Sequence, residues 1–196
     1  MINNYEYHAI GSYKSNLFDL IIKDELSEYL IDLLMPNLED NRFDKIDNFL
    51  GGTFTYNNAD GSSELVKLKG HLSDVPFVYT TISDTRNVIC MDTNIVKSSP
   101  STKEMLVELF IMCNKTSLAL DSSVKLKYRN LGYIGKNRLD IAVALLGDII
   151  NNSLKFGIGK LTPTPSNPVS SYYPNNDYFG KILRYTCSDF MIDYTG

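Results

Sequence analysis

Apolar residues recur at the spacing of a helix face near the start of the chain. The acidic residues of this segment lie mostly off the apolar stripe, which consists of Phe18, Ile22, Leu26, Tyr29, Leu30 and Leu33. Ser15 fits an N-cap and Pro36 a stop, so the pattern predicts one long helix whose stripe lies across a sheet. Residues 1–14 show no sustained period and predict an N-terminal arm that orders only against another surface. Exchange of this arm between subunits stays open.

The next segment is rich in asparagine and glycine. Residues 36–63 predict a loop or a short helix, followed by a turn at residues 57–61. A series of strands begins at residues 64–70, where apolar and polar residues alternate imperfectly, and continues through residues 75–82. Because Pro76 has no backbone N–H to donate, the second run is predicted to lie at a sheet edge or to begin a strand.

The middle of the chain carries the clearest strand pattern. Alternate residues of 89–95 and of 105–111 are apolar, which predicts two strands that each turn one face to a core. Residues 97–103 join them as a basic tip that is longer than a tight hairpin needs, so we expect an antiparallel pair with a protruding loop. Residues 114–137 are predicted to form a second polar excursion.

A second helix and two more strands complete the pattern. Asn137 fits an N-cap, and residues 138–150 are apolar around most of the helix circumference. Such a helix is buried on more than one side, or against a neighbouring subunit. Beyond it, residues 154–161 predict a strand, residues 162–177 a long polar loop and residues 178–187 a last strand that extends toward the C-terminus.

Length and composition indicate one ordinary globular unit. A chain of 196 residues is long enough to remove about 70% of its unfolded surface from water in a single core. No apolar run approaches the roughly 20 residues that span a bilayer, and residues 1–6 carry no secretory signal, so cytoplasmic synthesis is expected. We therefore predict a single α+β domain over residues 15–196, with a mixed, mainly antiparallel sheet packed with two main helices and joined by long polar loops.

Charge and candidate ligands narrow the chemistry. A net charge of −4 argues against a dedicated nucleic-acid binder, which normally presents a basic face to phosphates. Cys90, Cys113 and Cys187 are widely spaced and odd in number, so they predict buried free thiols. With only His8 and His71 beside them, a transition-metal site would need scattered carboxylates, and we expect neither a metal nor a cofactor.

Two glycine and lysine motifs resemble phosphate loops superficially. A phosphate loop needs Ser or Thr after its lysine, whereas Leu161 follows the motif at residues 157–160 and Asn137 follows that at residues 132–136. The first motif is better explained as a glycine bend, while the second does open a helix. Arg138 and Asp140 flank that helix start, where local capping, an intersubunit ion pair and a ligand contact are all open.

The order of the predicted elements resembles that of the α+β proteins that join head to tail in tailed bacteriophages, particularly tail terminators and related neck proteins. The resemblance is carried by the helix opening NRLD at residues 137–140 and by the terminal strand YFGKILRY at residues 178–185, and it covers residues 15–190. The chain is longer than many tail terminators, through its three polar excursions.

This resemblance implies a structural virion protein without enzymatic activity. It implies a ring of copies of this chain, six being the expected number, that joins the tail tube to the head connector, while DNA passes through the lumen without specific binding. No membrane or small-molecule substrate is implied, and the protein would move from the host cytoplasm into the virion. The expected partner contacts are Lys97, Lys103, Arg138, Asp140, Lys181 and Arg184.

Two other functions remain open on the sequence alone. An α+β enzyme or nucleotide-binding regulator would use residues 132–137 together with Arg138. A small binding module, such as an immunity protein, would stay monomeric and pair with one host partner.

Overall fold

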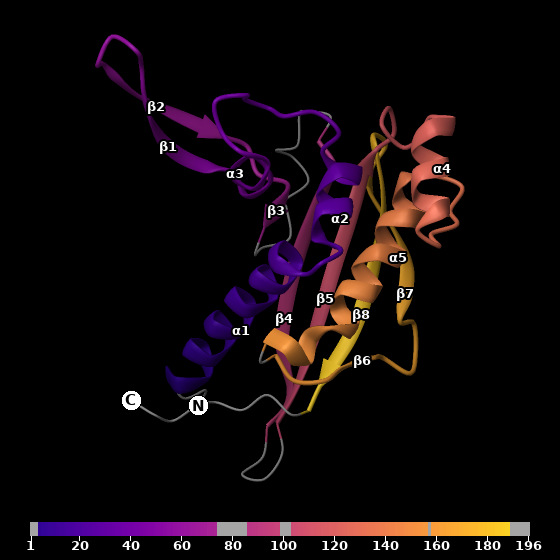
Figure 1. Ribbon diagram of the computed structural model, residues 1–196. Coiled ribbons are helices and arrows are strands. Elements are labelled where there is room, and N and C mark those ends of the chain that lie inside the picture. Colours follow the sequence, from indigo (N-terminus) through magenta and orange to yellow (C-terminus); the bar gives the residue numbers. More distant parts are fainter. Residues whose placement is uncertain (1–3, 74–85, 99–102, 157, 189–196) are drawn as a thin grey trace.

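A computed structural model describes residues 4–73, 86–98, 103–156 and 158–188 (Figure 1). The helices are α1 (Asn4–Lys23), α2 (Ser27–Leu34), α3 (Lys45–Leu50), α4 (Ser122–Asn130), α5 (Arg138–Asn151) and the 3-10 turn η1 (Ser153–Phe156). The strands are β1 (Gly52–Asn57), β2 (Ser63–Leu68), β3 (Leu72–Ser73), β4 (Val88–Ser98), β5 (Lys103–Asn114), β6 (Leu161–Pro163), β7 (Val169–Asn175) and β8 (Tyr178–Cys187).

A mixed, mainly antiparallel sheet forms the body of the protein, which confirms the α+β prediction. Its strand order is β3-β4-β5-β8-β6, and β7 also pairs with β8. All pairings are antiparallel except that of β3 with β4. The predicted pairing of residues 89–95 with 105–111 is confirmed, with Ile89 opposite Ile111. The last strand, β8, matches the predicted residues 178–187.

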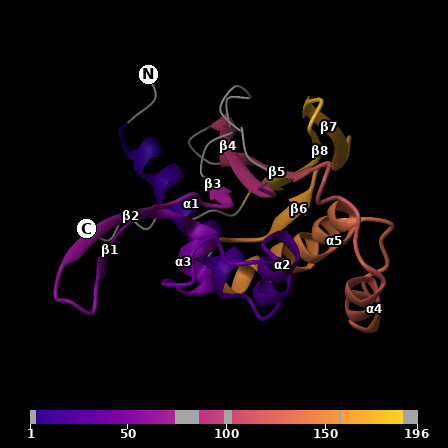
Figure 2. The ribbon, with the colours of Figure 1, turned by 90° about the horizontal axis from the view of Figure 1, so that it is seen from above.

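Helices α1, α2 and α5 pack on one face of this sheet (Figure 2). Leu145 on α5 and Leu109 on β5 are fully buried in the resulting core. The predicted cap of α5 is confirmed, because the Asn137 side chain accepts a hydrogen bond from the Asp140 N–H at 3.0 Å. Since α5 contacts α1, α2, β5 and β8, its apolar surface is covered by its own chain rather than by a neighbouring subunit.

The prediction of one long helix starting at Ser15 is wrong. Helix α1 begins at Asn4, and Tyr13 on this helix is buried in the core. Packing against the core therefore extends the helix into residues 1–14, where the sequence predicts an arm. The chain turns between α1 and α2 at Asp24, whose carboxylate accepts the Leu26 N–H at 3.0 Å and the side-chain amide of Asn152 at 2.8 Å.

Several predicted loops contain regular structure. Strand β1 lies in residues 36–63, helix α4 in residues 114–137 and strand β7 in residues 162–177. Conversely, the prediction of a strand at residues 154–161 is wrong: residues 154–156 belong to the turn η1, residues 158–160 have no regular structure, and only Leu161 joins β6. Pairing with β8 creates β6 and β7, and such tertiary pairing overrides a weak local pattern.

Other predictions have mixed outcomes. The turn at residues 57–61 is confirmed by a hydrogen bond from the Gly61 N–H to the Asn58 carbonyl, and the strand at residues 64–70 is confirmed as β2. The predicted strand at residues 75–82 lies outside the described residues, as do the loop tip 99–102 and the extension beyond residue 188.

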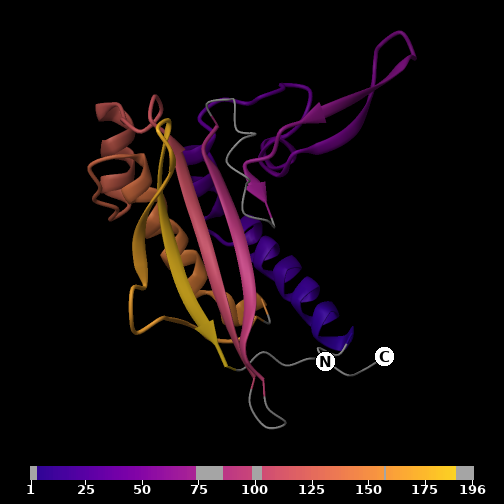
Figure 3. The same ribbon diagram turned by 180° about the vertical axis from the view of Figure 1, so that it is seen from behind.

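Strands β1 and β2 form a separate two-stranded sheet that projects from the body (Figure 3). Gly51 starts this hairpin with φ of 69°, in the left-handed region that favours glycine. A Cβ at Gly51 would lie 2.1 Å from the Gly70 nitrogen, so the two ends of the hairpin meet backbone to backbone.

Gly51→Ala is expected to lower the free energy of unfolding by about 2 kcal/mol, because alanine there has a strained φ and also clashes with backbone. Gly61→Ala is the matched control: Gly61 has φ of 83° but open space around it, so its expected cost is only about 1 kcal/mol. Urea denaturation followed by circular dichroism measures both. Equal losses would contradict the close backbone approach.

Candidate assembly surfaces

The projecting hairpin has one face anchored on the body. Phe54 and Tyr56 are half-buried on this face. The Phe43 ring lies 5.2 Å from the Phe54 ring and 6.0 Å from the Tyr56 ring, measured between centroids. These aromatic contacts fix the direction in which the hairpin leaves the body.

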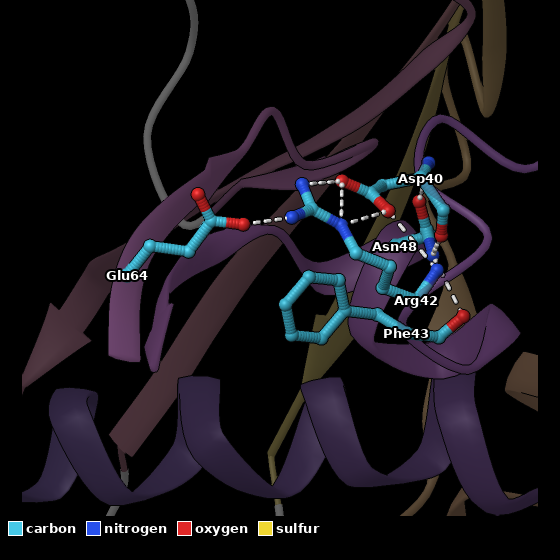
Figure 4. A network of polar contacts seen from close by, with 5 residues as sticks. All are labelled: Asp40, Arg42, Phe43, Asn48 and Glu64. Carbon is cyan, nitrogen blue, oxygen red and sulfur yellow. Dashed lines mark hydrogen bonds and ion pairs between the residues drawn. The ribbon is translucent and has the colours of Figure 1, made fainter. Parts of the chain in front are cut away.

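A brace of charged groups ties the same face to residues 40–48 (Figure 4). The Arg42 guanidinium donates to both Asp40 carboxylate oxygens, with Nη2 2.6 Å from Oδ2, and it also pairs with Glu64 on β2. The Cζ atom of the Arg42 guanidinium lies 4.9 Å from the centroid of the Tyr56 ring. Buried Asn48 holds the other end, because its amide donates to the Asp40 carbonyl and its oxygen accepts the Asp40 N–H.

The hydrogen bonds from Arg42 lower the pKa of the Asp40 carboxyl to about 2. A lowered carboxyl pKa contributes its stabilisation fully above the ordinary value and loses it as the pH falls toward 2. The ion pair between Asp40 and Arg42 is therefore fully formed above the ordinary carboxyl pKa and is lost as the pH falls toward 2.

The other face and the long edges of the hairpin are exposed. The Asn58 N–H donates to the Ser62 carbonyl, so by the alternation of an antiparallel ladder the backbone groups of Ser63, Leu65 and Lys67 point away from β1. Leu65 is 76% exposed. In the described part of the chain, β1 and β2 pair only with each other. An isolated two-stranded sheet is marginally stable, and an exposed edge invites another strand.

The main sheet has a second face, opposite the helices (Figure 2), and Val88, Cys90, Met112 and Tyr178 are buried in a cluster on it. Glu108 on β5 and Arg184 on β8 are directly opposite each other and form an ion pair, with Nε 2.7 Å from Oε1. Arg184 Nη1 also donates to the Ser170 hydroxyl on β7 at 2.8 Å. The rings of Phe110 and Tyr172 meet edge to face on the same side of the sheet. This face therefore carries apolar side chains and also a row of polar side chains, Glu108, Arg184 and Ser170, that runs from β5 to β7.

Two of the predicted contact residues lie together on β8. Arg184 lies on the face of the sheet opposite the helices, and Lys181 donates to the Ser171 hydroxyl at 3.1 Å. Both cations thus bond to side chains of β7. Lys97 and Lys103 lie at the ends of β4 and β5, where the chain approaches the loop tip, and their side chains lie outside the described part.

The other two predicted residues bond to groups of their own protomer, and Arg138 is buried. Arg138 is 8% exposed and donates to the Ser117 carbonyl at 2.7 Å and to the Leu33 carbonyl. Burial lowers the pKa of its guanidinium. Asp140 accepts the Lys136 N–H at 3.2 Å. Of the three alternatives left open for this helix start, the hydrogen bonds of Arg138 within its own protomer support local packing.

A family model, YomW, matches residues 27–187, from the start of α2 to the end of β8. The chain belongs to the YomW family. This is a Bacillus phage-type (SPBc2 prophage-like) family, which agrees with the association with phages that the resemblance implies. No curated protein and no solved structure matches the chain.

A cleft of about 370 Å³ lies at the C-terminal end of α2 in this YomW-family protein. Its wall includes Asn87, which is 3% exposed and which sequence reasoning missed. The Asn87 amide donates to the Leu34 carbonyl at 2.9 Å, and its oxygen accepts the Asn114 N–H at 3.1 Å and the Ser117 hydroxyl at 2.5 Å. Hydrogen bonds that join α2, β4 and β5 therefore use the polar atoms of this side chain.

The helix start proposed for the nucleotide-binding alternative is capped from within. A phosphate at a helix N-terminus binds the first free N–H groups. Here Asn137 accepts the Asp140 N–H, and Asp140 accepts the Lys136 N–H. The Asp140 N–H is thus already bonded to Asn137, and the Arg138 N–H donates to the Leu118 carbonyl. Among the described residues, no group of three metal-ligating side chains is placed to hold a metal ion, and no helix is long and apolar enough to cross a membrane.

The three cysteines are buried and free, as predicted. Burial raises the pKa of the Cys113 thiol to about 12. We expect the folded protein to react with a thiol reagent at pH 8 at least about a hundred-fold more slowly than the urea-unfolded chain, since reaction requires thiolate and access. Absorbance of the released thiol measures both rates. Rapid reaction of one thiol in the folded protein would contradict the burial.

Proposed function

We propose that this YomW-family protein is a structural component of a tailed-phage particle that assembles with copies of itself into a tail-terminator-like ring at the neck. The ring would join the tail tube to the head connector, with DNA in its lumen. The observation that carries the proposal is the braced hairpin β1–β2, which projects from the body with exposed edges and with Leu65 76% exposed. An exposed strand pair that is held to the body on one face favours a protein partner on the other.

Charge also supports this role. The net charge is −4. Three of the arginine side chains, those of Arg42, Arg138 and Arg184, bond to groups of their own chain. A channel wall that bound phosphates tightly would slow the passage of DNA, so an acidic lumen suits the proposal.

Quantitative mass spectrometry of particles purified from an induced lysogen tests the proposal. We expect the chain at about six copies per particle, as for one closed ring. Deletion of its gene is expected to leave filled heads and unattached tails, and a plasmid copy should restore joined particles. Absence of the chain from particles whose capsid and tail proteins are detected would overturn the proposal and favour the monomeric binding module.

A further inference from the structure

The ring of the proposed function needs a repeating contact, and we infer that β2 of one protomer pairs antiparallel with β7 of a second copy, with Leu65 opposite Val169. This inference rests on the proposed function and names the partner of the hairpin. It concerns two strand edges that both lie in the described part of the chain.

The backbone groups of Val169 and Ser171 on β7 are not used in its pairing with β8. The Arg184 N–H donates to the Pro168 carbonyl at 2.8 Å, and Ser170 lies opposite Ile182. By the alternation of an antiparallel ladder, the backbone groups of residues 168 and 170 point toward β8, and those of Val169 and Ser171 point away from it. Among the described strands, β7 pairs with β8 alone.

The two edges match in length and in apolar surface. Strand β2 has 6 residues and β7 has 7. Leu65 and Val169 are 76% and 46% exposed, and the backbone groups of both point outward. Placing them opposite each other puts both side chains on one face, where an aliphatic cross-strand pair stabilises a sheet. Ser63 then lies opposite Ser171.

Charge supports the same register. With Leu65 opposite Val169, Glu64 lies opposite Ser170. The Ser170 hydroxyl already accepts a hydrogen bond from Arg184. The contact therefore brings the Glu64 carboxylate, which Arg42 pairs within its own protomer, close to the Arg184 guanidinium beside the β7 edge. This favours the alignment over those shifted by two residues, in which Ser62 or Val66 would lie opposite Ser170.

The occupant must be another copy. The hairpin and β7 lie on opposite sides of the protomer in all three ribbon views (Figures 1, 2 and 3). One protomer therefore cannot pair its own hairpin with its own β7. A contact between two different surfaces of the same chain is head to tail, and it repeats until a ring closes. Addition of a strand to an open sheet edge is an established way of joining chains.

Cysteine cross-linking tests the contact. Directly opposite residues of an antiparallel pair are about 5.5 Å apart between Cα atoms, a distance that a disulfide can span. The variants are Leu65→Cys and Val169→Cys in the full chain, in which the native cysteines are buried. Val96→Cys is the control, because Val96 is also exposed, at 54%, but lies on β4.

Under mild oxidation, the mixture of L65C and V169C chains should give about ten-fold more covalent dimer than the mixture of L65C and V96C chains. The double variant L65C/V169C should give a ladder of multimers. Dimers from L65C alone, or no excess over the control mixture, would overturn the inference. If such a sample still forms oligomers by light scattering, only this contact is wrong. A chain that is also absent from particles contradicts the proposed function itself.

Discussion

Leu145→Ala is expected to lower the free energy of unfolding by about 3 to 4 kcal/mol. Leu145 lies at the centre of α5 and is fully buried between the sheet and the neighbouring helices. Alanine removes its packing and leaves a cavity that rigid elements on both sides cannot fill. Because Leu145 packs inside its own protomer, the loss should be the same at protein concentrations ten-fold apart.

Urea denaturation at two concentrations measures this effect. Leu126→Ala on α4 is the control, since Leu126 is 57% exposed and its truncation should cost less than about 0.5 kcal/mol. A loss from Leu145→Ala that grows with concentration would show that α5 is buried between subunits, the alternative that the sequence left open.

The second large effect concerns the end of α2. Asn87→Ala should lower the free energy of unfolding by about 3 kcal/mol, because it leaves the buried Leu34 carbonyl and Asn114 N–H without the hydrogen bonds that Asn87 makes. The orphan carbonyls of a helix end need such a donor. The substitution also removes the side chain that connects the end of α2 to the end of β5.

Thermal and urea unfolding of Asn87→Ala give the measurement, and Asn94→Ala on β4, the strand that follows Asn87, is the control. Asn94 is exposed, and its side-chain amide donates to Asp92, so its replacement should change stability by less than about 0.5 kcal/mol. Similar small changes in both variants would mean that the Asn87 bonds are not needed to hold α2.

The strongest periodic patterns led to the correct elements. Residues 89–95, 105–111 and 178–187 alternate because one side faces the helices, and they form β4, β5 and β8. Asn137 was identified because a cap uses residues next to each other in sequence. By contrast, β7 is short, contains Pro174 and exists through its pairing with β8. Its formation depends on a partner strand that a local pattern does not reveal.

The partners of the candidate surface residues also could not be predicted from local sequence patterns. Lys181 and Arg184 were selected from their own strand, but their bonds to Ser171 and Ser170 follow from the position of β7. Arg138 was placed correctly at a helix start, whereas its carbonyl partners lie 21 and 105 residues away in sequence. The brace of the hairpin likewise joins Arg42 to a residue 22 positions away. Such partners become visible only when the chain is folded.

Self-assembly is the central claim, and native mass spectrometry of the purified full chain tests it most directly. The experiment covers a ten-fold range of concentration, with and without purified tail tubes. The expected result is one discrete oligomer, with about six copies, that grows at the expense of the monomer. A single species of 22.1 kDa at every concentration, with tail tubes as well as without them, would contradict the claim.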